Sequence, residues 1–422
     1  MIHGVKGMRD ILPPASGVWN QLEAAARRVF YRFNYQEIRT PIIEHTALFS
    51  RSVGEETDIV GKEMYTFEDR DGSSLTLRPE NTASVLRAYI EHHLEQHPGL
   101  QKLYYIGPMF RRERPQKGRF RQFYQIGAEV IGSDSPAIDA ELVELVIAIL
   151  EAVAISGFEL LINSVGSKES RAHFNGVLRE QLRQVAPRMC EDCRRRAETN
   201  PLRVLDCKVP EDQPIIDALP SILEFLDEAD QEHFRRVREF LDDRGIGYTV
   251  KPRLVRGLDY YARTTFEIVH GALGSQNAIL GGGRYDGLAE SLGSRVPAPG
   301  IGFSIGEDRL VMTMEEAGAA QPQALDLYIA PMGDPALRYC LGLAAEIRKL
   351  DVSVEVSVER KLKRMLELAN KLGARHTLIV GDNEIVSQSY TLKNMSTGDQ
   401  RALSQQELMN YFATNNRATW QK

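Results

Sequence analysis

The first half of the chain carries hydrophobic residues at two different spacings. Residues 16–34 have apolar or small side chains at helical spacing, and an extended apolar segment begins at Pro41. Two strands around a polar loop are predicted over 102–131, followed by an amphipathic helix over 138–155. The pattern therefore predicts helices packed against a sheet that contains an antiparallel pair of strands.

The pattern changes again in the second half. Residues 167–250 are charged and favour helices, and we interpret this stretch as an insertion. Short glycine-rich strands return over 253–305, and an alanine-rich linker is expected at Ala317–Ala324. Beyond it, an alternating α/β tail is predicted, with helices at 335–350 and 361–373 between strand-like runs at 326–331, 352–358, 377–381 and 389–395.

Composition places the chain among ordinary globular proteins. It has 422 residues, 43% hydrophobic and 26% charged, which predicts two or three domains. We expect no membrane span and no secretory leader, and we interpret the four cysteines as reduced thiols of a cytoplasmic protein. The net charge is −6, so a polyanionic partner would have to bind local basic patches.

The polar loop between the two central strands is such a patch. Residues 110–122 contain six basic side chains and one acid, Glu113. A solvated hairpin tip is the simplest explanation of a charge run. On the returning strand, however, alternation places Tyr124, Ile126, Ala128 and Val130 on one face and Phe123, Gln125, Gly127 and Glu129 on the other. The second face would present polar groups beside guanidinium groups, as the floor of a site does.

Other segments share this polarity. Arg78, Glu80 and Thr82 alternate just before a helix, where Asn81 or Thr82 is expected to serve as the N-cap. Residues 281–287 are too glycine-dense for a strand interior and indicate close approach to the backbone. Residues 300–310 predict a strand entering a helix whose second turn carries Arg309. No phosphate-binding glycine loop or dinucleotide fingerprint occurs, so arginines would have to hold any phosphate.

Four of these segments together carry a resemblance to a known family. In order along the chain, residues 111–125, 254–261, 282–287 and 302–309 resemble the motifs of bacterial-type histidyl-tRNA synthetases, which are class II aminoacyl-tRNA synthetases. The resemblance implies an α+β catalytic core with an antiparallel sheet over 1–322, including a helical insertion domain over 167–250. It also implies a C-terminal α/β anticodon-binding domain over 323–422, and a homodimer built partly through the segment around Pro41.

The resemblance also implies an activity and a set of site residues. The protein would activate histidine with ATP to histidyl-adenylate and pyrophosphate, and transfer histidine to the 3′ end of tRNA(His). Arg111 and Arg256 would be the catalytic pair at the α-phosphate. ATP would also meet Glu113, Phe123 and Arg309, with Mg²⁺ on the β- and γ-phosphates. The residues expected to bind histidine are Glu80, Thr82, Gln125, Glu129, Tyr260, Tyr261 and Tyr285.

Contacts with tRNA are less specific in the sequence. Gln116 and Arg119 are candidates for the acceptor end. Lys361, Lys363 and Arg364 begin a helix of the tail, where anticodon contact and a solvated helix face are equally good explanations. The basic insertion cluster at Arg194–Arg196, Arg203 and Lys208 is offset by neighbouring acids.

The sequence leaves two further questions open. Cys190, Cys193 and Cys207 have a zinc-like spacing, but a structural site needs four ligands, so no metal ligand is assigned. The alternative function is the non-catalytic, synthetase-like regulatory subunit of ATP phosphoribosyltransferase, which predicts eroded arginines and no anticodon-binding tail. The family's first motif usually has glycine where Asn34 stands, a substitution that asparagine tolerates because it adopts left-handed conformations readily.

Overall fold

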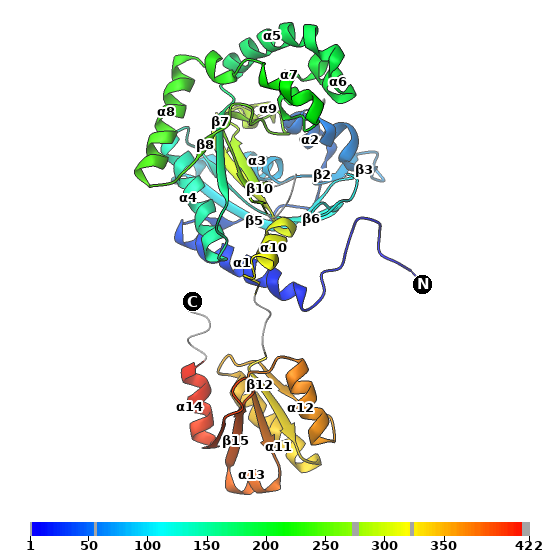
Figure 1. Cartoon of the computed structure of the whole chain (residues 1–422), viewed down its shortest axis with the longest axis vertical. Helices are drawn as coiled ribbons and strands as arrows, with labels where there is room; N and C mark the ends of the chain where they lie inside the picture. Colours follow the sequence, from blue (N-terminus) through cyan, green and yellow to red (C-terminus); the bar gives the residue numbers. More distant parts are fainter. Residues whose placement is uncertain (1, 55–56, 272–277, 321–324, 416–422) are drawn as a thin grey trace. The chain divides into compact units, whose positions relative to one another are not determined.

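The computed structural model describes residues 2–54, 57–271, 278–320 and 325–415 (Figure 1). Its internal packing divides the chain into two units, Met1–Gln321 and Pro322–Lys422. Each unit is built on its own sheet and its own hydrophobic core. Part of the expected linker, residues 321–324, lies outside the described residues.

An eight-stranded sheet is the centre of the first unit. Its neighbouring strands are antiparallel except for the parallel pairs at the two edges, β1 with β5 and β7 with β8. In spatial order the strands are β1 (Gln36–Glu37), β5 (Gln101–Phe110), β6 (Gln122–Ile131), β11 (Gly300–Gly306), β10 (Ala278–Arg284), β9 (Ala262–Val269), β7 (Glu159–Ser164) and β8 (Thr249–Val250).

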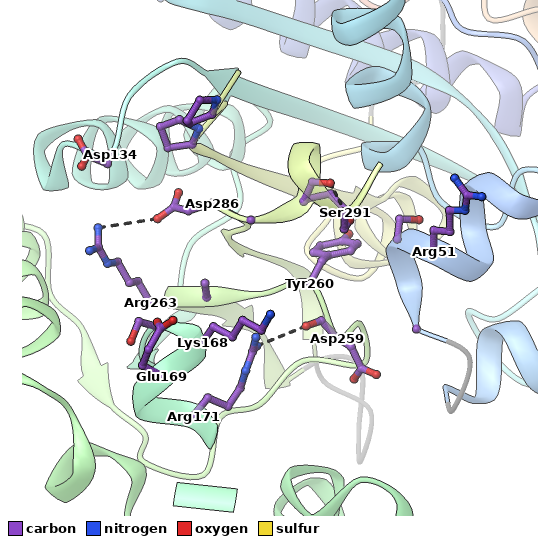
Figure 2. Close-up of a pocket in the computed structure, with 18 residues that line it drawn as sticks. Arg51, Asp134, Lys168, Glu169, Arg171, Asp259, Tyr260, Arg263, Asp286 and Ser291 are labelled. Atoms are coloured by element: carbon purple, nitrogen blue, oxygen red, sulfur yellow. Dashed lines mark hydrogen bonds and ion pairs between the residues drawn. The ribbon is translucent and has the colours of Figure 1, made fainter. Parts of the chain in front are cut away.

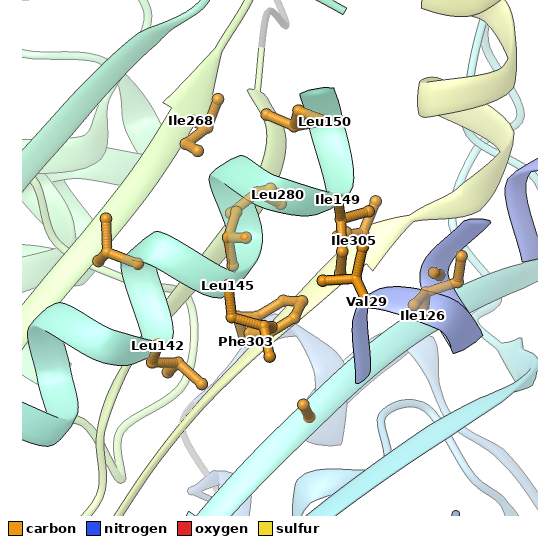
Figure 3. Close-up of a cluster of buried hydrophobic side chains, with 14 of the residues drawn as sticks. Val29, Ile126, Leu142, Leu145, Ile149, Leu150, Ile268, Leu280, Phe303 and Ile305 are labelled. Carbon is orange, nitrogen blue, oxygen red and sulfur yellow. The ribbon is translucent and has the colours of Figure 1, made fainter. Parts of the chain in front are cut away.

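One face of this sheet is covered by helices α1 (Ala15–Arg32), α4 (Pro136–Ala152) and α10 (Glu307–Glu316), and the core between them is apolar (Figure 3). Ser135 caps α4 by accepting a hydrogen bond from the Ala137 amide, and Pro136 begins the helix. From α4, Leu145 and Ile149 point toward the sheet. The predicted helices over 16–34 and 138–155 are confirmed. Asn34, after α1, has φ = 61°, the left-handed conformation expected of it.

The opposite face carries a smaller layer. A three-stranded antiparallel sheet, with order β2 (Ile43–His45), β4 (Ser74–Leu77) and β3 (Tyr65–Glu68), lies in this layer. Val85, Leu86 and Tyr89 of α3 pack on Tyr105 and Met109 of β5, so α3 covers the sheet here. The helical elements of the layer are α2 (Thr46–Val53), a π-helix (Ile59–Glu63), α3 (Thr82–Glu91), a short 3₁₀ turn (Leu94–Gln96) and α9 (Leu288–Ser291).

The predicted insertion is helical and has an apolar cluster of its own (green in Figure 1). Phe174, Leu178 and Leu182 recur at intervals of four along α5 and are fully buried in that cluster. The elements are α5 (Lys168–Val185), a 3₁₀ turn (Ala186–Arg188), α6 (Glu191–Thr199), η4 (Pro201–Asp206), η5 (Pro210–Asp212), α7 (Gln213–Asp217), a 3₁₀ turn (Ile222–Phe225) and α8 (Glu228–Asp243).

The second unit is a five-stranded mixed sheet with helices. Its order is β13 (Val354–Val356), β12 (Leu327–Pro331), β14 (His376–Val380), β15 (Ser389–Asn394) and β16 (Gln400–Ser404). The strand β12 is parallel to its neighbours β13 and β14, whereas β15 is antiparallel to its neighbours β14 and β16. The predicted helices correspond to α11 (Asp334–Arg348) and α12 (Leu362–Lys371). The pattern missed β16 and two helices, α13 (Asp382–Ser387) and α14 (Gln405–Asn415). No helix in the described ranges has the length and apolarity that a bilayer crossing requires.

One prediction about the first unit was wrong. Residues 281–283 lie inside β10, in the middle of the large sheet, although three glycines weaken a strand. Side chains of neighbouring segments pack directly onto this backbone. A Cβ at Gly281 would overlap the Arg256 guanidinium, and one at Gly282 would overlap the Phe266 ring and the Gly302 carbonyl. Close approach was therefore correctly predicted, but adjacent strands supply the stability that the glycines lack.

Candidate functional site

The strand β6 has two chemically different faces, as predicted. Ile126, Ala128 and Val130 are buried in the core under α1 and α4. Phe123 and Glu129 lie on the other face, where Phe123 packs beside the α3 layer and Glu129 is hydrogen-bonded to α3. This second face, between the large sheet and α3, is where most of the expected site residues lie.

Glu129 is deeply buried on this face, with only 1% of its surface exposed. Its carboxylate accepts hydrogen bonds from the Thr82 hydroxyl and the Tyr285 hydroxyl, each at 2.8 Å. Burial raises the pKa of Glu129 to about 8, even though these two hydrogen bonds act in the opposite direction. The nearby carboxylate of Glu80 acts in the same direction as burial, so the protonated form of Glu129 is favoured.

Glu80 caps the N-terminus of α3. Its carboxylate accepts hydrogen bonds from the Thr82 amide at 2.7 Å and the Ala83 amide at 3.0 Å. The prediction that Asn81 or Thr82 is the N-cap is confirmed in position for Asn81, which makes no side-chain cap hydrogen bond, however. Asn81 occupies the cap position, but its side-chain oxygen accepts hydrogen bonds from Thr40 and Arg78 instead. Glu80 is therefore fixed beside Glu129 by the helix backbone, and burial raises its pKa.

Three expected tyrosines lie together next to these carboxylates. The Tyr260 and Tyr261 ring centroids are 4.8 Å apart, and Tyr260 meets the edge of Tyr285 at 6.1 Å. Tyr261 lies against Gly283 of β10. Gln125 contributes a buried side-chain oxygen that has no hydrogen-bond partner among the described residues. The group is thus rich in polar atoms, and one of them is left for a further partner.

The Arg256 guanidinium packs against Gly281 in the glycine-rich strand β10. Its Nη1 donates to the Glu267 carboxylate at 2.5 Å, and Glu267 is the register partner of Gly281 on β9. Burial acts to lower the pKa of Arg256, but Glu267, Tyr261 and Asp206 together outweigh it and raise the pKa above its ordinary value. The guanidinium therefore stays charged and is held in one place.

Arg111 and Arg309 complete the set of expected arginines. Arg111 donates from Nε to the Pro79 carbonyl at 2.9 Å, and its guanidinium lies 5.4 Å from the centre of the Phe123 ring. Arg309 donates from Nη1 to the Ala278 carbonyl at 2.6 Å. It belongs to the first turn of α10, one turn earlier than predicted, because the helix begins at Glu307.

Electrostatic interactions link the arginines, tyrosines and carboxylates described above. Arg309 interacts electrostatically with Glu267, the partner of Arg256, and Tyr261 interacts with both Arg256 and Glu129. Arg111 also interacts electrostatically with Glu80. The predicted arginines, tyrosines and carboxylates therefore form one connected site rather than separate patches.

The polar loop folds back on itself. Arg119 donates to the Glu113 carboxylate at 3.0 Å, while the backbones of Gln116 and Arg119 form a small bridge. Gln116 is exposed and Arg119 is half-buried. Arg112, Arg114 and Lys117 are exposed, so much of the loop's charge remains available, as a surface that meets a polyanion requires.

A cavity of about 580 Å³ opens beside the site (Figure 2). Tyr260 is the only expected site residue that lines it. Its charged lining includes Arg51, Lys168 and Arg171, which sequence reasoning missed because they come from α2 and α5, far apart in the chain. A second cavity of about 270 Å³ is lined by Arg256 and Tyr261 together with residues of the insertion.

The other predicted basic clusters are largely paired or exposed. Arg196 pairs with Asp58 at 3.1 Å, and Lys208 pairs with Asp206 at 3.2 Å. In the second unit, Lys361 and Lys363 are exposed at the start of α12. Arg364, beside them, pairs with Glu359 at 3.3 Å.

Comparison with known proteins agrees with this arrangement. A family model described as Histidyl-tRNA synthetase matches residues 7–310, and one described as Anticodon binding domain matches residues 326–415. The histidine–tRNA ligase of Solibacter usitatus is 67% identical over 97% of this chain and 98% of its own length. That of Koribacter versatilis is 55% identical over 98% of this chain and 96% of its own.

A solved structure is similar over the same extent. The apo histidyl-tRNA synthetase of S. aureus is 38% identical, with a TM-score of 0.80, and the match covers 98% of this chain and 100% of that one. The shared architecture is a class II synthetase core followed by an anticodon-binding domain, in agreement with the expected fold class. The chain belongs to the histidyl-tRNA synthetase family.

Proposed function

We propose that this protein is a histidine–tRNA ligase, which activates histidine with ATP and then transfers it to the 3′ end of tRNA(His). One observation carries the proposal. The buried carboxylate of Glu129, held at 2.8 Å by both Thr82 and Tyr285, shares a sheet face with the arginines Arg111 and Arg256. A polar pocket suited to ring nitrogens thus lies beside guanidinium groups suited to phosphate.

The first step joins two anions. The histidine carboxylate oxygen attacks the α-phosphorus of ATP, a new O–P bond forms, and the bond to the β-phosphate oxygen breaks as pyrophosphate leaves with the electron pair. Because both reactants are negative, positioning and charge neutralisation are the main requirements, and no general base is needed. We assign this work to Arg111 and Arg256, the second of which is paired with Glu267.

The adenine end is assigned to Phe123, Arg309 and Glu113. The Phe123 ring offers a stacking surface, and Arg309, anchored on the Ala278 carbonyl, provides a flat guanidinium. Glu113 and Glu267 are each paired with an arginine. We therefore propose no protein ligand for Mg²⁺, which would arrive with ATP and neutralise charge on the β- and γ-phosphates.

Histidine recognition is assigned to the Glu129 group. Glu129, Tyr261 and Tyr285 would meet the imidazole nitrogens, with Tyr260 beside them. Glu80, Thr82 and the unpartnered oxygen of Gln125 would meet the ammonium group. Amino acids without matching ring nitrogens would leave these buried groups unpaired, which rejects them by roughly 10⁴–10⁵-fold.

The remaining partners follow from the same assignment. We propose that Gln116 and Arg119 meet the tRNA acceptor end, and that residues 326–415, which match the anticodon-binding domain, bind the anticodon. We further propose that the protein is a cytoplasmic homodimer. None of its four cysteines, all within the described residues, forms a disulfide, which fits a reducing compartment.

ATP–pyrophosphate exchange, measured with each amino acid in turn, tests the proposal. Exchange with histidine alone is the expected result. No exchange with any amino acid would refute it and would favour the regulatory-subunit alternative. That alternative is less supported, because the chain retains Arg111, Arg256 and Arg309 and its tail matches an anticodon-binding domain.

A further inference from the structure

Three cysteines and one buried aspartate converge in the helical insertion. Cys190 is the N-cap of α6, Cys193 lies in its first turn, Cys207 follows η4, and Asp212 ends η5. The three sulfur atoms and a carboxylate oxygen all lie within 4.8 Å of one another. We propose that these four side chains form a structural zinc site.

Two of the separations between these atoms fit a tetrahedral metal centre. With Zn–S bonds of about 2.3 Å and a Zn–O bond of about 2.0 Å, two sulfur ligands lie about 3.8 Å apart and a sulfur and an oxygen about 3.5 Å apart. The Cys190 and Cys207 sulfurs are 3.9 Å apart, and the Cys207 sulfur lies 3.3 Å from Oδ2 of Asp212. Both pairs are therefore already spaced as ligands of one ion.

Backbone amides surround these donor atoms. The Cys193 amide donates to the Cys190 sulfur at 3.4 Å, and the Val209 amide donates to the Cys207 sulfur at the same distance. The Cys190 amide donates to Oδ1 of Asp212 at 3.1 Å. Such outer hydrogen bonds orient metal ligands and stabilise the negative charge of thiolates.

The charge of Asp212 supports a cation at this place. Asp212 is 2% exposed and lies beside the apolar core of the insertion. No lysine, arginine or histidine in the described part of the chain forms an ion pair with it. A buried carboxylate without a cationic partner is costly, and a divalent ion bound by the three sulfurs would supply the missing charge.

The ligand set decides the kind of metal and its role. Three thiolates favour zinc over the hard cations magnesium and calcium. Four protein ligands leave no open position, so the ion would be structural rather than catalytic. Asp212 thus supplies the fourth ligand that the cysteine spacing lacked.

The site would also brace the catalytic unit. The segment between Cys193 and Cys207 carries Asn200, which donates to the Asp259 carboxylate at 2.8 Å, and Arg203, whose guanidinium lies against Gly257. Both contacts are made to the segment that carries Arg256. Holding α6 and η4 together would therefore steady the backbone that directly follows that arginine.

Metal analysis of the full-length chain tests the proposal. We expect about one zinc ion per chain in the wild type. Cys193→Ser and Asp212→Asn should lose most of it. Cys340→Ser is the matched control, because Cys340 is a buried cysteine in the separate core of the second unit, and it should retain the zinc. Zinc content equal in all four proteins would overturn the proposal, as would a zinc-free wild type.

Cobalt substitution provides a readout that does not depend on a variant's folding. Co²⁺ added to the metal-free wild-type chain should give the visible absorption of a tetrahedral, thiolate-bound ion, and zinc should displace it. Absence of that spectrum would refute the site. A Cys190–Cys207 disulfide, found by mass spectrometry in protein purified anaerobically, would also contradict it, because oxidised sulfurs cannot bind the metal.

Discussion

Replacing Glu129 by glutamine tests the electrostatics of the proposed histidine pocket. Burial raises the pKa of Glu129 from its ordinary 4.5 to about 8 in the ligand-free protein. The protonated form is therefore the one that the fold favours. The stability linked to this proton is fully present below about pH 4.5 and is lost as the pH rises through about 8, because unfolding lets the carboxyl ionise.

The size of the effect follows from the shift. A change from 4.5 to about 8, at about 1.4 kcal/mol per pKa unit, corresponds to an upper limit of about 5 kcal/mol. Glutamine keeps a carbonyl oxygen that can accept a hydrogen bond from Thr82 or Tyr285, but it cannot ionise. Relative to the wild type, Glu129→Gln should therefore gain stability as the pH rises.

Urea unfolding of ligand-free wild type and Glu129→Gln, measured between about pH 5 and about pH 8, provides the assay. Over this pH range, the unfolding free energy of the variant should increase by a few kcal/mol relative to that of the wild type. Glu316→Gln, at an exposed position, is the control and should show no such trend. A pH-independent difference between Glu129→Gln and the wild type, or one of opposite sign, would refute the reasoning.

The remaining predictions concern activity. Arg256→Ala should lower the rate of ATP–pyrophosphate exchange by roughly 10²–10³-fold while tRNA binding persists, and equal loss of both would indicate misfolding instead. Gly281→Ala should lower exchange as well, because its methyl group displaces the Arg256 guanidinium; wild-type exchange in this variant would contradict that geometry. A chain ending at Gln321 should retain histidine-dependent exchange but charge tRNA(His) poorly, whereas full charging would show that the second unit is dispensable.

The parts of the fold that the sequence predicted well are those with long, regular patterns. The helix of α4 and the two-faced strand β6 each repeat an apolar spacing over many residues, and both are present. Short elements were missed because they contain too few residues to show such a repeat. The helix α13 has only six residues, too few to display a period. The glycine strand β10 is stabilised by neighbours far away in the sequence, which no local pattern reveals.

The same distinction holds for the candidate site. Arg111, Arg256 and Arg309 belong to recognisable motifs, so their positions could be anticipated. The role of Glu80 as the cap of α3 depends on Asn81 being engaged by Thr40 and Arg78, which only the folded chain shows. Asp212 likewise has no sequence signature, because folding brings it to the cysteines.

A crystal structure with ATP and histidinol, a histidine analogue without the reacting carboxylate, tests the central claim most directly. We expect the α-phosphate within hydrogen-bonding distance of Arg111 and Arg256, and an imidazole nitrogen on the Glu129 carboxylate. Nucleotide bound instead in the cavity lined by Arg51 and Lys168, with Arg256 still occupied only by Glu267, would contradict it.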